Sequence, residues 1–97
     1  MRLTVRPAAR ADLIEIGDYI AADSPVRAVS FVAEIEAVIV REIATRPASF
    51  PSRFDLAANL RMARHGRYLI FFICEAESVE VVRVLHGERD LKGLFET

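Results

Sequence analysis

The sequence contains little cysteine, glycine and proline, and no long apolar run, and each shortage excludes a class of protein. One cysteine, Cys74, cannot form an internal disulfide, so the fold must rest on its apolar core. Four glycines and four prolines beside 53% hydrophobic residues exclude a disordered or fibrous chain. The longest uncharged apolar run, 68–74, is far shorter than the roughly 20 residues of a membrane-spanning helix, and no signal-peptide pattern precedes it. We expect one small domain over 1–97, located in the cytoplasm.

Lysine is nearly absent, and positive charge is not in excess. Thirteen basic side chains against fourteen acidic ones give a net charge of −1, which leaves no overall positive field to attract nucleic acid. We therefore expect no direct sequence-specific binding to nucleic acid. All the basic residues except Lys92 are arginines. Biased codon usage in the source genome is the favoured explanation. The alternative is that planar, always-charged side chains suit specific contacts. In either case, lysine-dependent chemistry is almost excluded.

The N-terminal half predicts a strand followed by two helices. Leu3 and Val5 alternate with polar residues, which predicts a strand over 2–6. A helix over 8–22 is predicted by apolar residues at helical spacing, namely Ala9, Leu13, Ile16 and Ile20. Two acidic residues near its start, Asp12 and Glu15, are expected to complement the helix dipole. Ser24 and Pro25 suit the start of a second helix, which Pro47 ends at Arg46. The short connection predicts an antiparallel helical hairpin.

The C-terminal half predicts a three-stranded meander. Residues 47–59 form an aperiodic loop, which is either functional or a plain crossover. Strands are expected over 60–64, 67–74 and 79–86, of which the second is apolar on both faces and therefore central. The remaining residues predict a terminal helical turn. The fold class is therefore α+β, in the order β-α-α-β-β-β, with the helical hairpin packed on an antiparallel sheet.

Residue types that could carry chemistry are few and scattered. The four glycines form no phosphate-binding motif, and His65, His86 and Cys74 lack metal-ligand spacing, so we expect no cofactor, no metal and no catalytic residue. Cys74 ends the most buried-looking strand, where an inert thiol is expected. His86 could act as an acid or base, but bracing the Gly87 turn is the favoured interpretation because no partner is fixed nearby.

One cluster of basic residues stands out. No acid lies between Asp55 and Glu75, and the basic side chains in and after this interval are candidates for binding a target: Arg61, Arg64, Arg67, Arg83, His86 and Arg89. The alternative is a solvated sheet surface, in which Arg83 or Arg89 pairs with Glu80, Glu88 or Asp90.

Three stretches together resemble the ParE branch of the ParE/RelE toxins of type II toxin–antitoxin modules, once described as plasmid stabilisation proteins. They are Ala-Asp-Leu-Ile-Glu-Ile-Gly-Asp-Tyr-Ile-Ala at 11–21, Gly-Arg-Tyr-Leu-Ile-Phe-Phe at 66–72 and Arg-Val-Leu-His-Gly-Glu-Arg-Asp-Leu at 83–91. The predicted element order is also that of the family. The resemblance covers almost the whole chain, with Phe72 standing where a tyrosine is common.

The resemblance implies a toxin that is neutralised by a cognate ParD-like antitoxin of the ribbon-helix-helix type. Such an antitoxin wraps its C-terminal segment around the toxin, and a helix laid in an apolar groove would secure it. The candidate lining residues come from the hairpin: Leu13, Ile16, Tyr19, Ile20, Phe31 and Ile35. Each of them could instead belong to the core, which is the favoured interpretation for Leu13 and Ile35. Because Arg67 opens the central strand, we expect Arg67→Ala to weaken either the fold or the binding of the antitoxin.

The resemblance also implies a choice between two targets. ParE-like members are similar to inhibitors of DNA gyrase, whereas RelE-like members resemble ribosome-dependent mRNA endonucleases that use lysines and a C-terminal tyrosine or histidine. Here the strand 60–64 has no lysine, and Phe95 occupies the C-terminal aromatic position. Arg89 matches a basic position of the ribonuclease set, but alone it could only stabilise charge. The sequence therefore favours a non-catalytic gyrase inhibitor over a ribonuclease or a degenerate toxin that only binds its antitoxin.

Overall fold

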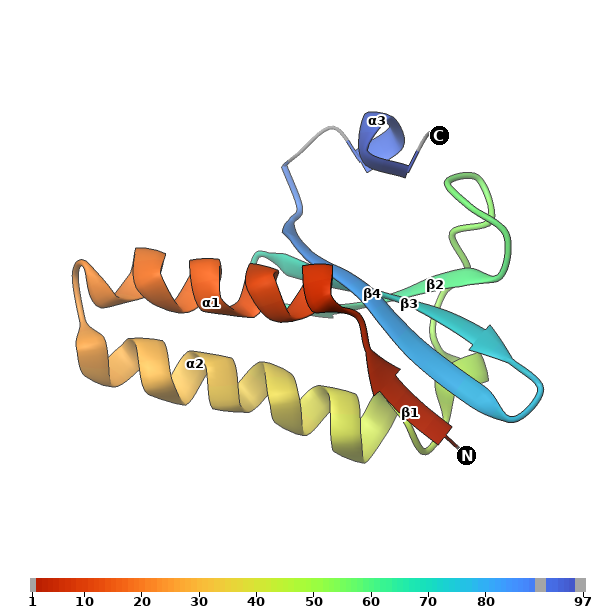
Figure 1. Cartoon of the computed structure of the whole chain (residues 1–97), viewed down its shortest axis with the longest axis horizontal. Helices are drawn as coiled ribbons and strands as arrows, with labels where there is room; N and C mark the ends of the chain where they lie inside the picture. Colours follow the sequence, from red (N-terminus) through yellow and green to blue (C-terminus); the bar gives the residue numbers. More distant parts are fainter. Residues whose placement is uncertain (1, 89–90, 96–97) are drawn as a thin grey trace.

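A helical hairpin and a four-stranded sheet make up the fold (Figure 1). The structure is a computed structural model that describes residues 2–88 and 91–95. Its elements in chain order are β1 (Arg2–Val5), α1 (Pro7–Ala21), α2 (Pro25–Val38), a π-helical turn (Ile39–Ile43), a 3-10 turn (Pro47–Ser49), β2 (Leu60–His65), β3 (Tyr68–Glu75), β4 (Ser78–His86) and α3 (Leu91–Phe95). The predicted α+β class and order are confirmed.

The sheet is mixed, with the strand order β1-β4-β3-β2. Strands β2, β3 and β4 form the predicted antiparallel meander. β1 instead lies parallel to β4, with Val5 opposite Val81, so the sheet is not wholly antiparallel as predicted. The whole hairpin and two strands separate β1 from β4 along the chain, so no tight turn between them fixes β1 in the antiparallel direction.

The hairpin begins and ends close to the predicted residues. The hydroxyl oxygen of Ser24 accepts a hydrogen bond from the backbone N–H of Arg27 at 3.2 Å, and Pro25 occupies the first turn of α2. After Val38 the helix widens into a π-helical turn, where the N–H of Ala44 donates to the carbonyl of Ile39. Ile39 and Ile43 are both buried in this turn and belong to the core between the hairpin and the sheet.

Both faces of the sheet are covered, which explains why β3 is apolar throughout. One core lies between the hairpin and the sheet and contains Ile16, Ile35 and Phe72. The other lies under α3 and the loop before β2, where Phe71 packs with Phe95. The 47–59 loop also borders the outer edge of β2 through a bridge between Ser52 and Arg61. None of the helices in 2–88 and 91–95 is long and apolar enough to cross a membrane.

Candidate functional site

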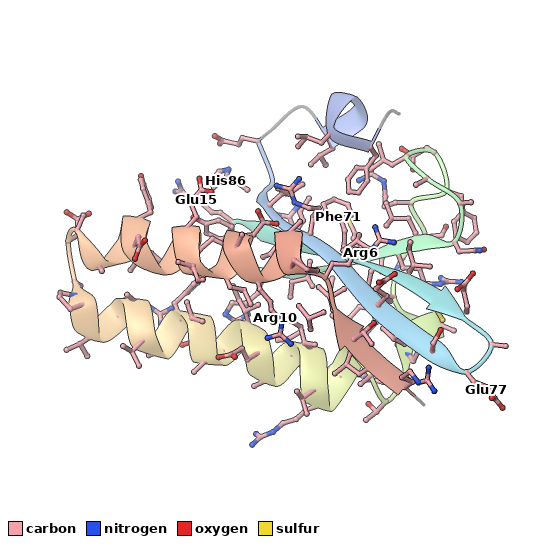
Figure 2. All side chains as sticks on the ribbon, viewed as in Figure 1. Arg6, Arg10, Glu15, Phe71, Glu77 and His86 are labelled. Carbon is pink, nitrogen blue, oxygen red and sulfur yellow. The ribbon has the colours of Figure 1, made fainter. Side chains whose placement is uncertain are left out.

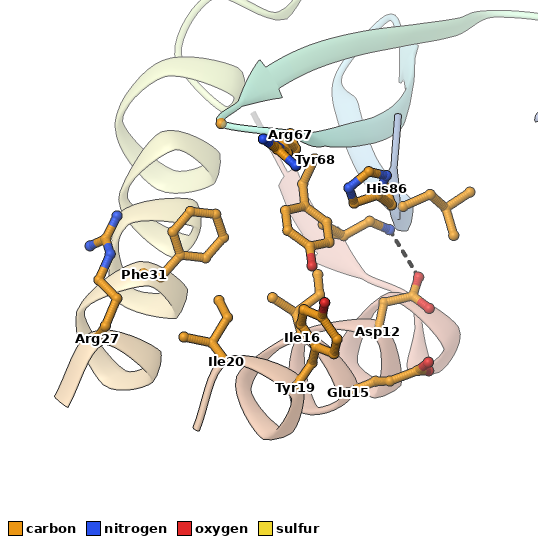
Figure 3. A pocket seen from close by; sticks show the side chains of 13 residues that line it. Asp12, Glu15, Ile16, Tyr19, Ile20, Arg27, Phe31, Arg67, Tyr68 and His86 are labelled. Carbon is orange, nitrogen blue, oxygen red and sulfur yellow. Dashed lines mark hydrogen bonds between the residues drawn. The ribbon is translucent and has the colours of Figure 1, made fainter. Parts of the chain in front are cut away.

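A groove of about 570 Å³ opens between the helical hairpin and one end of the sheet. Figure 2 shows Glu15 on α1 and His86 at the end of β4 on the same side of the molecule. Figure 3 shows apolar side chains from both helices and β3 that face one another across the groove. The lining residues labelled in Figure 3 are Asp12, Glu15, Ile16, Tyr19, Ile20, Arg27, Phe31, Arg67, Tyr68 and His86. The groove is therefore apolar along its walls and charged at its rim.

A buried carboxylate fixes one wall of this groove. Both Asp12 carboxylate oxygens accept from the Arg83 guanidinium, at 2.8 and 2.9 Å, and one also accepts from the Val84 N–H at 2.9 Å. β1 ends at Val5, opposite Val81, so β4 continues past it and the Asp12 side chain takes the place of a strand partner at Val84. Asp12 is 7% exposed, and the hydrogen bond to it raises the pKa of Arg83, which therefore stays charged.

This ion pair corrects two sequence predictions. Asp12 was expected to complement the dipole near the start of α1, but it lies beyond the first turn and points into the protein. If not bound to a target, Arg83 was expected to pair with Glu80, Glu88 or Asp90, but its partner is Asp12. Target binding by Arg83 stays a prediction. Glu80 pairs with Arg6 instead. Arg83 thus joins β4 to α1 and is engaged within the chain.

Phe31 organises the opposite wall. The centre of its ring lies 5.1 Å from Cζ of Arg27, and 5.2 and 5.7 Å from the ring centres of His65 and Tyr68. The ring centres of Tyr68 and His86 are 5.3 Å apart. These contacts join α2 to β3 and to the end of β4. Burial raises the pKa of the Tyr68 hydroxyl, which keeps it protonated near neutral pH. The wall is therefore a set of packed rings with an arginine and a histidine at its edge.

Glu34 ties the same wall to the turn between β2 and β3. Its carboxylate accepts from Arg27 at 2.6 Å and lies 2.8 Å from Nε2 of His65. The hydrogen bond from Arg27, followed by the one from His65, lowers the pKa of Glu34 to about 2. Glu34 therefore remains ionised far below the pH at which a free carboxyl takes up a proton.

We expect Glu34→Gln to make the free energy of unfolding less dependent on pH below pH 4.5. Because the pKa of Glu34 is lowered from 4.5 to about 2, its contribution is present above pH 4.5 and lost as the pH falls towards 2. Wild-type protein should therefore lose more stability than Glu34→Gln across that interval. Urea unfolding at a series of pH values measures the difference, and parallel profiles for the two proteins would contradict the assignment.

Four of the six antitoxin-binding candidates meet in this groove. Ile16, Tyr19, Ile20 and Phe31 line it, and Tyr19 is 76% exposed although it is a large aromatic residue. Ile35 is completely buried in the core between the hairpin and the sheet. Leu13 packs against that core and borders a different groove on the outer side of the hairpin. The preference for core over groove at Leu13 and Ile35 agrees with these positions.

The target-binding candidates are divided more widely. Arg67 and His86 line the groove, whereas Arg64 is exposed outside it. Arg61 donates to the carbonyl of Phe50 at 2.8 Å and stacks on Phe54, so it holds the 47–59 loop. Arg89 lies outside the described residues. Nδ1 of His86 accepts from the N–H of Glu88 at 3.2 Å, which is the bracing role favoured from the sequence.

Sequence reasoning missed several side chains of the groove. Asp12, Arg27 and Tyr68 come from three different elements, and their juxtaposition depends on how the hairpin lies on the sheet. Arg27 had a usable signal, since it precedes Phe31 by one helical turn. In the described part of the chain, no group of three or more His, Cys, Asp or Glu residues is placed to hold a metal ion.

Comparison with known proteins identifies the family. A family model described as "ParE toxin of type II toxin-antitoxin system, parDE" matches residues 3–91. The chain belongs to the ParE toxin family. Its fold is similar to that of the structure "Chromosomal ParDE TA system from P. aeruginosa", with a TM-score of 0.73 and 21% identity over 91% of this chain and 97% of that one. No curated protein sequence matches this ParE-family chain significantly.

Proposed function

We propose that this ParE-family chain is the toxin of a type II toxin–antitoxin pair and inhibits DNA gyrase by protein–protein contact, without catalysis. Membership of the ParE toxin family over residues 3–91 is the observation that carries the proposal. The antitoxin is proposed to be a ParD-like protein of the ribbon-helix-helix type, and the site of action the cytoplasm.

The position of Phe95 supports gyrase over RNA as the target. A ribonuclease needs a general acid, a general base and cations for the phosphate. Phe95, at the C-terminal aromatic position, has no ionisable proton and packs on Phe71 at 5.0 Å, in the core under α3. The groove lies on the hairpin side of the sheet, so Phe95 is separated from Arg67 and His86. β2 carries arginines where ribonucleases of the superfamily use lysines.

The groove suggests how an antitoxin would neutralise the toxin. Candidates for the two partners, such as Tyr19 for the antitoxin and Arg67 for the target, line the same groove. An antitoxin helix that buries an apolar face on Ile16, Tyr19 and Ile20 would place its polar rim beside Arg67 and His86. Acidic residues in that rim would pair with these cations. Neutralisation would then be steric, because the antitoxin and the target would compete for one surface.

Induction of the chain in growing cells, followed by assays of the purified protein, tests the target. We expect growth arrest, inhibition of gyrase supercoiling and accumulation of cleaved DNA. Normal supercoiling at saturating toxin would refute the gyrase proposal. Primer extension on translated mRNA separates the alternatives, because new cuts would indicate a RelE-like ribonuclease. Unimpaired growth without the antitoxin gene would indicate a degenerate toxin that only binds its antitoxin.

A further inference from the structure

The outer side of the helical hairpin carries a second apolar surface, which the proposed function does not use. On α1, Ile14 is 67% exposed, and on α2, Val26 and Val29 are 82% and 74% exposed. They project away from Ile16 and Phe31, which pack on the sheet side of the two helices. A shallow groove runs between the helices here, and Val32 and Ala33 form part of its lining. Branched apolar side chains gathered on one face of a small domain indicate an interaction surface.

Charged residues on this surface are arranged symmetrically about Ile14. Arg10, Ile14 and Asp18 follow one another at intervals of four along α1, and all three line the outer groove. Figure 2 shows Arg10 over the hairpin, between α1 and α2. Within residues 2–88 and 91–95, the side chains of Arg10 and Asp18 make no hydrogen bond or ion pair. The central apolar residue is thus flanked by an unpaired positive charge on one side and an unpaired negative charge on the other.

We propose that the outer hairpin face binds a second copy of this chain. A two-fold axis beside Ile14 would lay α1 antiparallel on α1 of the second copy. Ile14 would then pack against its own counterpart, and Arg10 of each copy would meet Asp18 of the other. The arrangement is self-complementary because the two charges have opposite sign and lie equally far from Ile14 along the helix. Val29 on α2 extends the apolar contact, and Glu36 adds an acid at the Arg10 end of the groove.

The dimer explains the unpaired charges better than a helix of another protein does. A foreign helix would need its own acid and base at matching positions, whereas a second copy supplies both from the same α1. The groove between the hairpin and the sheet remains open in this dimer, because its lining residues lie on the other side of the helices. The inference is independent of the proposed function, since its test requires neither gyrase nor an antitoxin.

Sedimentation velocity of the purified chain over a range of micromolar concentrations tests the dimer. We expect a monomer–dimer equilibrium that Ile14→Arg abolishes without a change in melting temperature. Phe54→Arg is the matched control, because Phe54 is 57% exposed on the 47–59 loop and should leave the dimer intact. Arg10→Asp and Asp18→Arg should each weaken the dimer by roughly tenfold, since each places like charges together at both ends. The double variant that combines Arg10→Asp with Asp18→Arg should restore the dimer affinity, because the two charges are then exchanged.

Several results would overturn the dimer. The wild-type chain could be monomeric at every concentration, or its dimer could be unaffected by Ile14→Arg. Failure of the double charge exchange to recover the affinity lost in the single variants would also reject the antiparallel pairing of α1. A monomeric chain whose Ile14→Arg variant loses affinity for its antitoxin would assign this face to the antitoxin instead.

Discussion

Asp12→Ala should lower the free energy of unfolding by about 3–5 kcal/mol, the usual cost of removing one partner from a buried ion pair. Asp12 is 7% exposed and accepts three hydrogen bonds, two from Arg83 and one from Val84. Alanine would leave a partly buried guanidinium without a counter-charge and a buried N–H without an acceptor. The free energy of unfolding of a small domain is about 5–15 kcal/mol, so the variant should lose a large fraction of its stability.

Urea unfolding monitored by circular dichroism measures the loss. Asp12→Asn should fall between alanine and wild type, because an amide oxygen can still accept one of the three hydrogen bonds but carries no charge. Arg6→Ala is a suitable control, since the Arg6–Glu80 pair is exposed and should contribute less than about 1 kcal/mol. If Asp12→Ala and Arg6→Ala were equally stable, the ion pair would not be the link between α1 and β4.

Local sequence patterns predicted most of the fold. Apolar spacing defined α1 and the start of α2, and proline and serine marked where the second helix begins. The apolar run 68–74 was correctly placed as a central strand, since β3 lies between β2 and β4. These features depend on neighbours within a few residues, which is the information that periodicity carries.

Features set by distant residues could not be predicted in this way. The parallel pairing of β1 with β4 depends on how the chain returns after the hairpin. The π-helical turn at Ile39–Ile43 was not predicted either, because apolar residues four apart fit an ordinary α-helix equally well. Asp12 has its partner 71 residues away, and nothing in the local pattern of α1 distinguishes a buried carboxylate from an exposed one.

Only part of the candidate site could be predicted, because the site also depends on residues that are distant in the sequence. Tyr19 and Phe31 were named because the family resemblance implies a groove along the hairpin, and Arg67 because it lies in an acid-free interval. That these residues share one groove follows only from the packing of the hairpin on the sheet. Arg61 lies in the same acid-free interval as Arg67, and Arg83 lies on the following strand, yet the side chains of both are engaged within the chain.

Arg67→Glu should weaken the proposed inhibition of gyrase roughly tenfold while leaving the fold intact, as expected when a charge at an interface is reversed. Arg67 is exposed at the rim of the groove, and its side chain makes no hydrogen bond to any residue of the described ranges. For Arg67→Ala, which the sequence predicts to weaken either the fold or antitoxin binding, the same exposed position favours weakened antitoxin binding over a weakened fold. The concentration of toxin that halves supercoiling measures inhibition, and the melting temperature shows whether the fold is intact.

Arg41→Glu provides the matched control for this prediction. Arg41 is also exposed and carries the same charge, but it lies in the π-helical turn, at the end of the hairpin away from Phe31 and the groove. Both variants change the net charge equally, so an effect of overall charge would weaken them alike. Reduced inhibition by Arg67→Glu alone would locate the gyrase contact at the groove. Equal inhibition by wild type and Arg67→Glu would exclude Arg67 from that contact and require the target to bind elsewhere on the toxin.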